Sequence, residues 1–258
     1  RALPEPRVAK ILRSETSLLR RQLAIGRELA RRKATRFVVW GATLAIVLWG
    51  TAAFALHGRA GSAVVAAFVL VLAAGYEVHL REIARESHFI EGGRRGEQKM
   101  AELLAERLAD DHVILNDLEL RVAHERAQID HLVIAPSGIY VIESKFWAGT
   151  FSGDVRDAHW TQTKSNGTVR HMKSPVQQCE RQRRMFITLL ASKVPEDRIH
   201  ALAVFTHRFV NLQIANSKNR VFLTNDAIRF INDRCFDLPI LTPAEVLELA
   251  EKINRGQA

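Results

Sequence analysis

The sequence predicts an α/β (α+β) protein, in which a mixed β-sheet is flanked by helices and preceded by a basic amphipathic helix and a two-helix transmembrane hairpin. Three observations predict this fold class. Two apolar runs without charge lie near the N-terminus, β-branched apolar strands lie in the middle of the chain, and segments with helical apolar spacing alternate with those strands. We therefore expect an amphipathic helix at 1–36, a membrane hairpin at 37–78, a linker at 79–92 and an α/β domain at 93–258.

The composition is that of a basic protein with one large core. The chain has 258 residues, of which 47% are hydrophobic, and 37 Lys and Arg against 28 Asp and Glu give a net charge of +9. That length suffices for one core and an appendage. The two cysteines, Cys179 and Cys235, have neither metal-binding nor disulfide spacing, which favours a reducing compartment and a packing role for each thiol.

The first 36 residues resemble a basic amphipathic helix, because apolar and basic side chains recur on opposite sides at helical spacing. The apolar side comprises Val8, Ile11, Leu12, Leu18, Leu19, Leu23, Ile25 and Leu29, and the basic side comprises Lys10, Arg13, Arg20, Arg27 and Arg31. Such a helix can lie on anionic lipid, pair with another chain or bind nucleic acid, in that order of preference, or it can simply be solvated.

Two uncharged runs predict the hairpin. Residues 37–56 provide the roughly 20 apolar positions that a helix needs to cross the hydrocarbon core of a bilayer. Residues 60–76 come near the lower limit of about 17 positions. Only His57-Gly58-Arg59 separates the two runs, so we expect an antiparallel hairpin, 37–56 and 60–76, with both ends on one side.

The charges that flank the hairpin predict its orientation. Residues 1–36 contain eleven Lys and Arg against three Glu, and Arg81, Arg85, Arg94 and Arg95 follow the second run. Positive flanks stay in the cytoplasm, so we expect two spans in an inner (plasma) membrane of bacterial type, with both termini cytoplasmic. The alternative is a buried hairpin of a soluble protein, in which uncharged runs of this length are uncommon.

Apolar spacing also predicts the elements of the α/β domain. A flexible basic junction at 91–96 leads into a helix at 97–108. Strands begin at 113 and cover 129–134 and 139–145, and residues 150–173, with the turn signal Asn166-Gly167, predict a β excursion. The remaining expected elements are a helix at 175–192 that begins with Pro175, strands at 200–206 and 220–224, and helices at 226–232 and 243–253.

Candidate catalytic residues lie on the two strands joined by Pro136-Ser137-Gly138. If the turn is centred between the first two of these residues, antiparallel partners have numbers that sum to 273, which places Asp130 opposite Glu143. Side chains alternate along a strand, so Glu143 and Lys145 share a face. Opposed carboxylates repel each other, so this arrangement needs Lys145, a divalent cation, or both as a counter-charge.

Two carboxylates suit Mg²⁺, with Mn²⁺ as a substitute, because hard cations prefer oxygen ligands and keep positions open for water and phosphate. Such an ion polarises a phosphodiester oxygen and lowers the pKa of a bound water. Lys145 can orient or deprotonate that water and offset the charge that develops on the phosphate. The spacing alone leaves open that Asp130 and Glu143 are edge charges and that Lys145 is a solvated strand end.

Further motifs surround these strands in a fixed order. They are Gly96-Glu97, Gln128-Ile129-Asp130-His131, the strand ending Glu143-Ser144-Lys145, Phe146-Trp147-Ala148-Gly149, Trp160 and Pro175-Val176-Gln177-Gln178. Through these motifs the chain from about Gly93 to Phe205 resembles the NERD family, the nuclease-related domain of the PD-(D/E)xK restriction-endonuclease-like superfamily.

The resemblance implies a restriction-endonuclease-like mixed sheet and roles for five residues. It implies Asp130 and Glu143 as metal ligands, Lys145 as the catalytic lysine, Glu97 as a helix carboxylate near the centre, and Gln178 as a polar residue reaching in from the following helix. Where the family usually has Asn before the proline, this chain has Ser174, which we expect to cap the helix.

For several other side chains, the sequence allows both a functional and a structural role. Six basic residues can neutralise phosphates along a groove or form a solvated face: Lys164, Arg170, Lys173, Arg181, Arg183 and Arg184. Trp147 and Trp160 can stack on bases or pack in the core. His131 points away from the face of Asp130, which favours a packed or hydrogen-bonded histidine.

These observations predict a membrane-anchored, Mg²⁺-dependent nuclease, a hydrolase of phosphodiester bonds that acts on DNA rather than RNA. The alternative is a non-catalytic nucleic-acid-binding or membrane-localised interaction module that keeps the nuclease fold. A complete set of Asp130, Glu143, Lys145 and Gln178 favours the enzyme, because a degenerate module would be expected to lose one of them. A third hypothesis is a membrane scaffold assembled through the N-terminal helix.

Overall fold

The computed structural model describes residues 10–13, 17–57, 60–190, 193–234 and 237–256. The predictions for Val8 and Cys235 lie outside the described residues. The chain divides into two compact units. One is Ser17–Gly92, and the other combines the N-terminal segment that holds strand β1 (Lys10–Arg13) with Gly93–Ala258.

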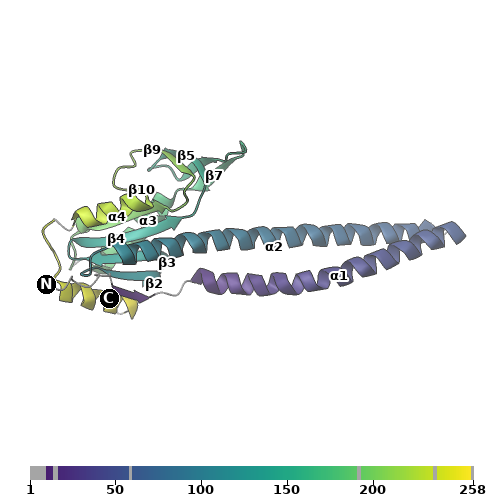
Figure 1. The fold of residues 1–258 in the computed structure, drawn as a ribbon, viewed down its shortest axis with the longest axis horizontal. Coiled ribbons are helices and arrows are strands. Elements are labelled where there is room, and N and C mark those ends of the chain that lie inside the picture. Colours follow the sequence, from purple (N-terminus) through teal and green to yellow (C-terminus); the bar gives the residue numbers. More distant parts are fainter. Residues whose placement is uncertain (1–9, 14–16, 58–59, 191–192, 235–236, 257–258) are drawn as a thin grey trace, which may run out of the picture. The chain divides into compact units, whose positions relative to one another are not determined.

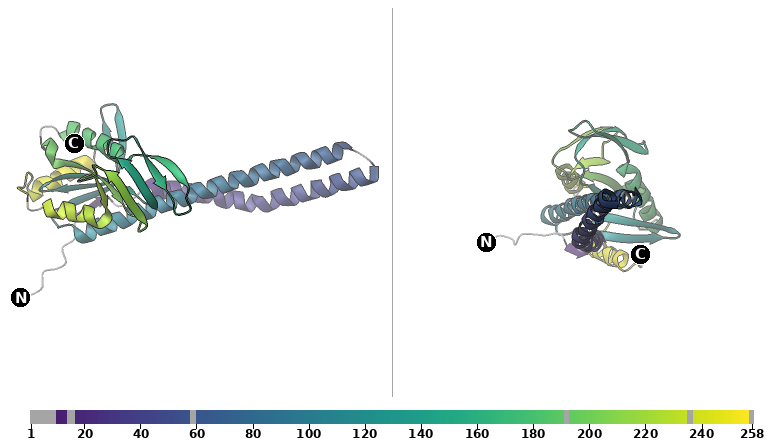
Figure 2. Two further views of the ribbon diagram at one scale, coloured as in Figure 1. Left: turned by 90° about the horizontal axis from the view of Figure 1, so that it is seen from above. Right: turned by 90° about the vertical axis from the view of Figure 1, so that its right-hand side faces the viewer.

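The first unit contains helix α1 (Ser17–His57) and the part of helix α2 (Ala60–Arg107) up to Gly92, which run antiparallel and side by side (Figures 1 and 2). Both helices are long and apolar enough to cross a membrane, and only 17% of the most apolar stretch of each is buried. Near one end of the pair, Arg36 Nε and Trp40 Nε1 donate to Glu77 Oε1 at 2.6 and 2.8 Å. The two helices are therefore candidate membrane spans.

Two expectations for the N-terminal half are wrong. Lys10–Arg13 forms a strand instead of part of a helix at 1–36, because its backbone pairs in parallel with the strand that begins at Val113. The helix is present from Ser17 onward. The junction at 91–96, which we expected to be flexible, is helical and belongs to α2, and the linker at 79–92 is part of the same helix. A glycine costs a helix only about 1 kcal/mol, which the long helical segments on either side offset.

The larger sheet of the α/β unit has six strands in the order β1-β2-β3-β4-β8-β10. The strands after β1 are β2 (Val113–Val122), β3 (Glu125–Ala135), β4 (Gly138–Lys145), β8 (Ile199–Phe205) and β10 (Val221–Leu223). Strands β2, β3 and β4 are antiparallel neighbours, whereas β4, β8 and β10 run parallel to one another. The sheet is therefore mixed, as predicted.

A second, four-stranded sheet has the order β7-β6-β5-β9. Strands β5 (Gly149–Asp154), β6 (His159–Thr163) and β7 (Val169–Lys173) confirm the predicted β excursion. Strand β9 (Val210–Ala215), which pairs in parallel with β5, was not predicted.

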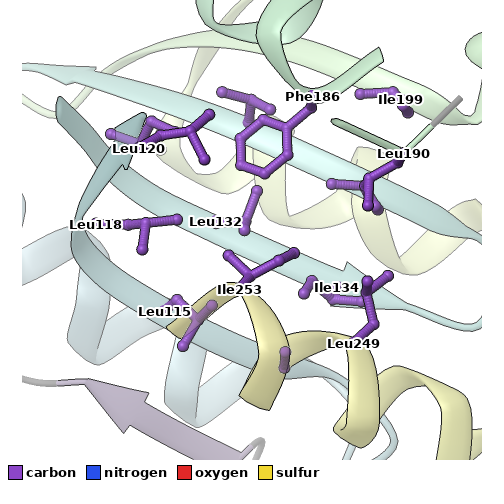
Figure 3. Packing of buried hydrophobic residues seen from close by; sticks show 14 of the residues in the cluster. Leu115, Leu118, Leu120, Leu132, Ile134, Phe186, Leu190, Ile199, Leu249 and Ile253 are labelled. Carbon is purple, nitrogen blue, oxygen red and sulfur yellow. The ribbon is translucent and has the colours of Figure 1, made fainter. Parts of the chain in front are cut away.

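Helices cover both faces of the larger sheet. Helices α3 (Pro175–Leu190) and α5 (Pro243–Asn254) cover one face, where Phe186, Leu190 and Ile253 pack against Leu132 and Ile134 (Figure 3). The C-terminal turns of α2 and helix α4 (Thr224–Asp233) cover the other, through Met100, Leu104 and Ile228. Strands with both faces buried explain the continuous apolar runs in β3 and β4. The end of β4 that carries Glu143 thus lies beneath α3.

Candidate active site

The predicted register of β3 and β4 is confirmed. His131 pairs with Ile142 and Ala135 with Gly138, so partner numbers sum to 273 along the ladder. Asp130 and Glu143 occupy the next position of this register. At this end the backbone N–H and the hydroxyl of Ser144 donate to Asp130 Oδ2, at 2.8 and 3.3 Å. The Asp130 carboxylate is thereby fixed against the backbone of β4.

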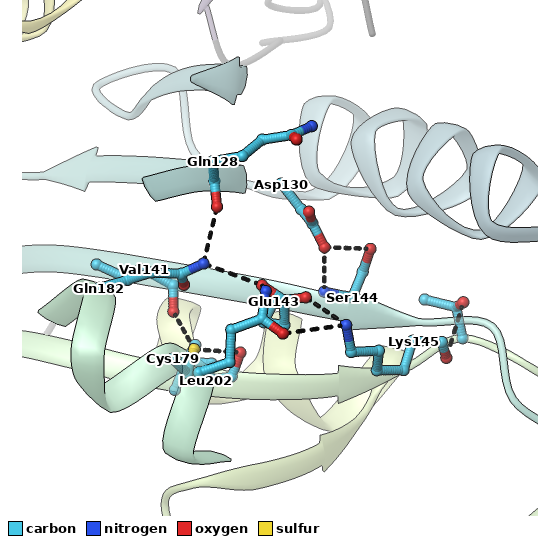
Figure 4. Close-up of polar contacts among 11 residues, drawn as sticks. Gln128, Asp130, Val141, Glu143, Ser144, Lys145, Cys179, Gln182 and Leu202 are labelled. Carbon is cyan, nitrogen blue, oxygen red and sulfur yellow. Dashed lines mark hydrogen bonds and ion pairs between the residues drawn. The ribbon is translucent and has the colours of Figure 1, made fainter. Parts of the chain in front are cut away.

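Glu143 lies at the centre of a buried polar network (Figure 4). Its side chain is only 2% exposed. Lys145 Nζ donates to Oε1, and the side-chain amides of Gln178 and Gln182 donate to Oε2 at 2.7 and 3.1 Å. A buried carboxylate is costly unless it is paired and hydrogen-bonded, and these three donors meet that requirement.

Both glutamines lie on helix α3. They are four residues apart and share one helical face, so both amides can reach the same carboxylate of Glu143. Between them, the thiol of Cys179 is buried and donates to the carbonyls of Val141 and Leu202, at 3.3 and 3.4 Å. These contacts fix α3 across β4 and β8. The packing role predicted for Cys179 is therefore confirmed.

The acidic groups around Glu143 hold their protons more tightly than usual. Burial, reinforced by the charges of Glu143 and Glu97, raises the pKa of Asp130 well above its ordinary value. Burial, then the charges of Asp117 and Glu143, raises the pKa of Glu97 to about 7. These raised pKa values reflect several carboxyl groups gathered in a buried place, and a bound cation would favour their ionised forms.

Lys145 stays positively charged in this environment. Burial by itself would lower its pKa, but the carboxylates of Glu143 and Asp130 outweigh burial, so that the pKa is raised above its ordinary value. Its ammonium also lies 5.4 Å from the ring centroid of Trp147. In this state the Lys145 ammonium is a hydrogen-bond donor to anions.

The donor set fits a hard cation that keeps several waters. Among the residues that the structure describes, no group of three or more His, Cys, Asp or Glu side chains is arranged to hold a metal ion. Asp130 and Glu143 supply two carboxylates, and Mg²⁺ commonly binds through one or two carboxylates with water and phosphate completing its shell. The residues present are therefore compatible with Mg²⁺ or Mn²⁺.

Two residues of the site were not predicted from the sequence. Asp117 is buried in the middle of β2 with a φ of 51°, a strained value for a residue other than glycine, and its Oδ1 accepts from Gln128 at 2.7 Å. A polar pair, Asn116-Asp117, within an apolar strand was the available signal. Gln182 could have been found from its position one turn after Gln178.

The basic residues predicted to contact phosphates lie on different elements of the structure. Arg181 is engaged, since its guanidinium pairs with Glu125 at 2.9 Å. Arg184 is exposed on α3, and Lys164, Arg170 and Lys173 lie on or beside β6 and β7. Arg183 donates to the carbonyl of Glu196 at 2.9 Å, which is a structural contact.

The aromatic and histidine residues singled out from the sequence have packing contacts in the structure. Trp160 is fully buried and its Nε1 donates to the carbonyl of Asp154 at 2.8 Å, so a base-stacking role for it is wrong. Trp147 is half-buried and stacks on Phe151. His131 is buried and its Nδ1 donates to Asn116 Oδ1 at 2.8 Å, as predicted. The predicted cap at Ser174 is wrong, because its buried hydroxyl has no hydrogen-bond partner.

A cavity of about 460 Å³ lies at the opposite end of β4, beside the β3–β4 turn. Its lining includes His112, Ser137, Ile240 and Thr242, and none of the five predicted catalytic residues. The candidate chemistry therefore does not coincide with this cavity, and the polar network around Glu143 remains the candidate site because that is where the carboxylates and Lys145 converge.

Comparisons with known proteins find a family model that matches the part of the chain carrying the candidate site. Residues 92–206 match the family model described as nuclease-related domain, or NERD. An uncharacterized protein of Bacillus anthracis is 31% identical over 71 residues, which are 27% of this chain and 34% of that protein. The chain thus spans about a third of the length of this relative. No solved structure matches the chain.

Proposed function

We propose, from the premise that residues 92–206 form a nuclease-related domain, that this protein is a membrane-anchored, Mg²⁺-dependent nuclease that hydrolyses phosphodiester bonds in DNA. The observation that supports this most strongly is the convergence on Glu143. Lys145, Gln178 and Gln182 all donate to its carboxylate, and Asp130 and Glu97 are close enough for their charges to interact with it. Perturbed acidic groups cluster at functional sites more than elsewhere.

Each residue has a distinct task in this proposal. Asp130 and Glu143 would hold Mg²⁺, which when bound supplies Lewis-acid polarisation of the phosphodiester and a water of lowered pKa. Gln178 and Gln182 hold the Glu143 carboxylate in one orientation. Protonated Lys145 donates to a phosphate oxygen as negative charge develops there. Glu97, with a pKa of about 7, is suited to accept a proton near neutral pH.

A cleavage assay on the full chain in detergent tests the proposal. Plasmid, linear and single-stranded DNA are incubated with Mg²⁺, Mn²⁺ or EDTA. We expect cleavage only with a metal, and a loss of about 100-fold or more in rate for Asp130→Asn, Glu143→Gln and Lys145→Ala. The first two variants keep the size of the side chain, and thermal unfolding of each variant checks that a loss of rate does not reflect misfolding.

A surface ion pair on α5 provides the matched controls. Lys252 donates to Glu248 on exposed turns of that helix, so Glu248→Gln and Lys252→Ala change the same residue types outside the site. Both controls should cleave at the wild-type rate. Cleavage by Lys145→Ala at the wild-type rate would instead attribute the activity to a contaminating nuclease and refute the assignment.

A second candidate is a non-catalytic nucleic-acid-binding module. The observation that favours it is that the described residues offer no cluster of three metal-ligating side chains. Binding of DNA by the full chain, without cleavage under either metal, would support this candidate over the nuclease.

We further infer that α1 and α2 anchor the protein in an inner membrane, with two spans and cytoplasmic termini. Their length and apolar composition support this, as do the basic flanks. The nuclease domain would then meet nucleic acid at the cytoplasmic surface of the bilayer.

A further inference from the structure

The segment that follows β8 runs beside the segment that leaves the candidate site. The Thr206 backbone N–H donates to the carbonyl of Lys145 at 3.0 Å, and the Gly149 backbone N–H donates to the carbonyl of Phe209 at 2.8 Å. These two bonds align 206–209 with 145–149. Phe209 is therefore held opposite Gly149, in the segment that directly follows Lys145.

Phe209 presents its ring to solvent. Its side chain is 64% exposed, and it belongs to none of the apolar clusters that form the described core. The guanidinium carbon of Arg208, itself exposed, lies 4.3 Å from the ring centroid. The backbone N–H of Phe209 donates to His207 Nδ1 at 3.1 Å, which orders the loop. The ring of His207 also lies 5.8 Å from the Phe209 ring in a tilted arrangement, and the exposed part of the Phe209 side chain leaves room for a further planar group.

The surroundings of the ring are basic and aromatic. The ring of His207 packs edge-on against Phe146 at 4.7 Å, and burial, followed by the charges of Arg208 and Lys99, lowers the pKa of His207. The cations of Arg208 and Lys99 therefore lie near this histidine, which is neutral at physiological pH. A ligand that stacks on Phe209 meets the positive charge of Arg208 beside the ring, on a segment whose backbone pairs with that of Lys145. This arrangement suits an aromatic base carried on a phosphate backbone.

We propose that Phe209 and Arg208 form a stacking platform for an unpaired nucleotide next to the active site. The substrate class is therefore single-stranded nucleic acid, or the unpaired strand at a duplex end. In a duplex both faces of a base are covered by its neighbours, so a base reaches the ring only where it is unstacked. Arg208 neutralises the adjacent phosphate. This inference rests on the proposed nuclease function and names the form of its substrate.

Binding to the full chain, measured without turnover, tests the platform. Fluorescence anisotropy of a single-stranded 20-mer and of the same sequence as a blunt duplex is measured in the Glu143→Gln background. We expect Phe209→Leu to weaken single-strand binding about tenfold, the effect of one lost base stack, and to change duplex binding less than about twofold. Phe209→Trp should restore single-strand binding, since it keeps an aromatic face.

Two further variants separate stacking from charge and from folding. Arg208→Gln should weaken single-strand binding and reduce its dependence on salt, whereas Arg229→Gln, an exposed arginine on α4, should change neither. Equal binding of the single strand by wild type and Phe209→Leu, or equal losses for single strand and duplex, would overturn the platform.

Kinetic and binding measurements together distinguish a failure of the platform from a failure of the nuclease proposal. If wild type and Phe209→Leu cleave single-stranded DNA with the same KM, the platform is overturned and the nuclease proposal stands. Single-strand binding that depends on Phe209 in a chain that never cleaves would support the platform and refute the nuclease.

Discussion

At the scale of single residues, the site depends on the hydrogen-bond donors that surround the buried side chain of Glu143. Two amides from α3 and one ammonium from its own strand donate to its two oxygens. Removing one donor leaves a buried carboxylate partly unsatisfied, which commonly costs about 1–3 kcal/mol or more. Gln178 and Gln182 therefore contribute to stability as well as to the orientation of Glu143.

Buried His131 gives the protein a pH dependence of known sign. Burial lowers its pKa to about 3, against 6.5 for an ordinary histidine. Between these values the unfolded chain binds a proton that the folded chain does not, so stability falls as the pH falls from about 6.5 toward 3. The slope from this group approaches about 1.4 kcal/mol per pH unit.

We expect His131→Leu to flatten that slope. The free energy of unfolding by urea, measured in EDTA at pH 7, 6 and 5, should fall more steeply for wild type than for the variant. The variant also loses the bond to Asn116, so its stability at pH 7 is lower and only the slopes are compared. Parallel slopes for the two proteins would show that His131 does not titrate as its burial requires.

Part of the site was predictable at the residue scale, and the reasons are specific. Strand alternation and the position of the Pro136-Ser137-Gly138 turn fixed the register that brings Asp130 to Glu143. Asp117 was not predicted, because its place in the site depends on a positive φ within β2, and the polar pair Asn116-Asp117 does not by itself indicate that backbone conformation. Neither was the pairing of Arg181 with Glu125, which joins residues far apart in sequence.

At the scale of elements, α2 packs closely against the loops that follow β4 and β8. A Cβ added at Gly96 would lie 2.7 Å from Phe146 Cβ and 2.8 Å from Thr206 Oγ1. No side chain fits at this position, so Gly96 allows the helix that carries Glu97 to approach the strand ends. This contact explains a glycine within a helix better than a flexible junction does.

Gly96→Ala should therefore destabilise the protein, although alanine is the better helix former. In an open helix the change stabilises by about 1 kcal/mol, whereas overpacking here should cost about 1–3 kcal/mol. Gly26→Ala on α1 is the matched control, because a Cβ there meets nothing within 4 Å. Thermal unfolding of the full chain in detergent compares them, and a higher melting temperature for Gly96→Ala than for wild type would contradict the close packing.

Whether a segment forms a helix or a strand was easier to predict than how the segments pair and join. The apolar strands and amphipathic helices of the domain appear where periodicity placed them, within a few residues. Strand β1 was missed because four residues with a short apolar core fit a helix or a strand equally, and only pairing with β2 decides between them. The helix across 91–96 was missed because the glycines in that segment were given more weight than the helical segments on both sides.

At the scale of the whole molecule, the proposal joins a candidate membrane hairpin to a nuclease-related domain. The outward sides of α1 and α2 carry exposed apolar residues such as Phe37, Leu48 and Phe68. Exposing such apolar side chains to water is unfavourable, whereas exposing them to the hydrocarbon core of a bilayer is not.

Membrane insertion predicts both fractionation and orientation. The full chain should remain in the membrane pellet after alkaline carbonate, and reporters fused to either terminus should be active only on the cytoplasmic side. Leu48→Arg, which puts a charge in the first run at a cost of about 3 kcal/mol, should release a larger soluble fraction than Leu48→Ala. A chain that carbonate extracts, or termini on opposite sides, would contradict the hairpin.

The central claim is that Asp130 and Glu143 share one cation, and electron paramagnetic resonance of Mn²⁺ titrated into the full chain tests it most directly. We predict one bound Mn²⁺ per chain in wild type and in Lys145→Ala, competition by Mg²⁺, and loss of that binding in both Asp130→Asn and Glu143→Gln. Unchanged Mn²⁺ binding in either of those two carboxylate variants would contradict the claim.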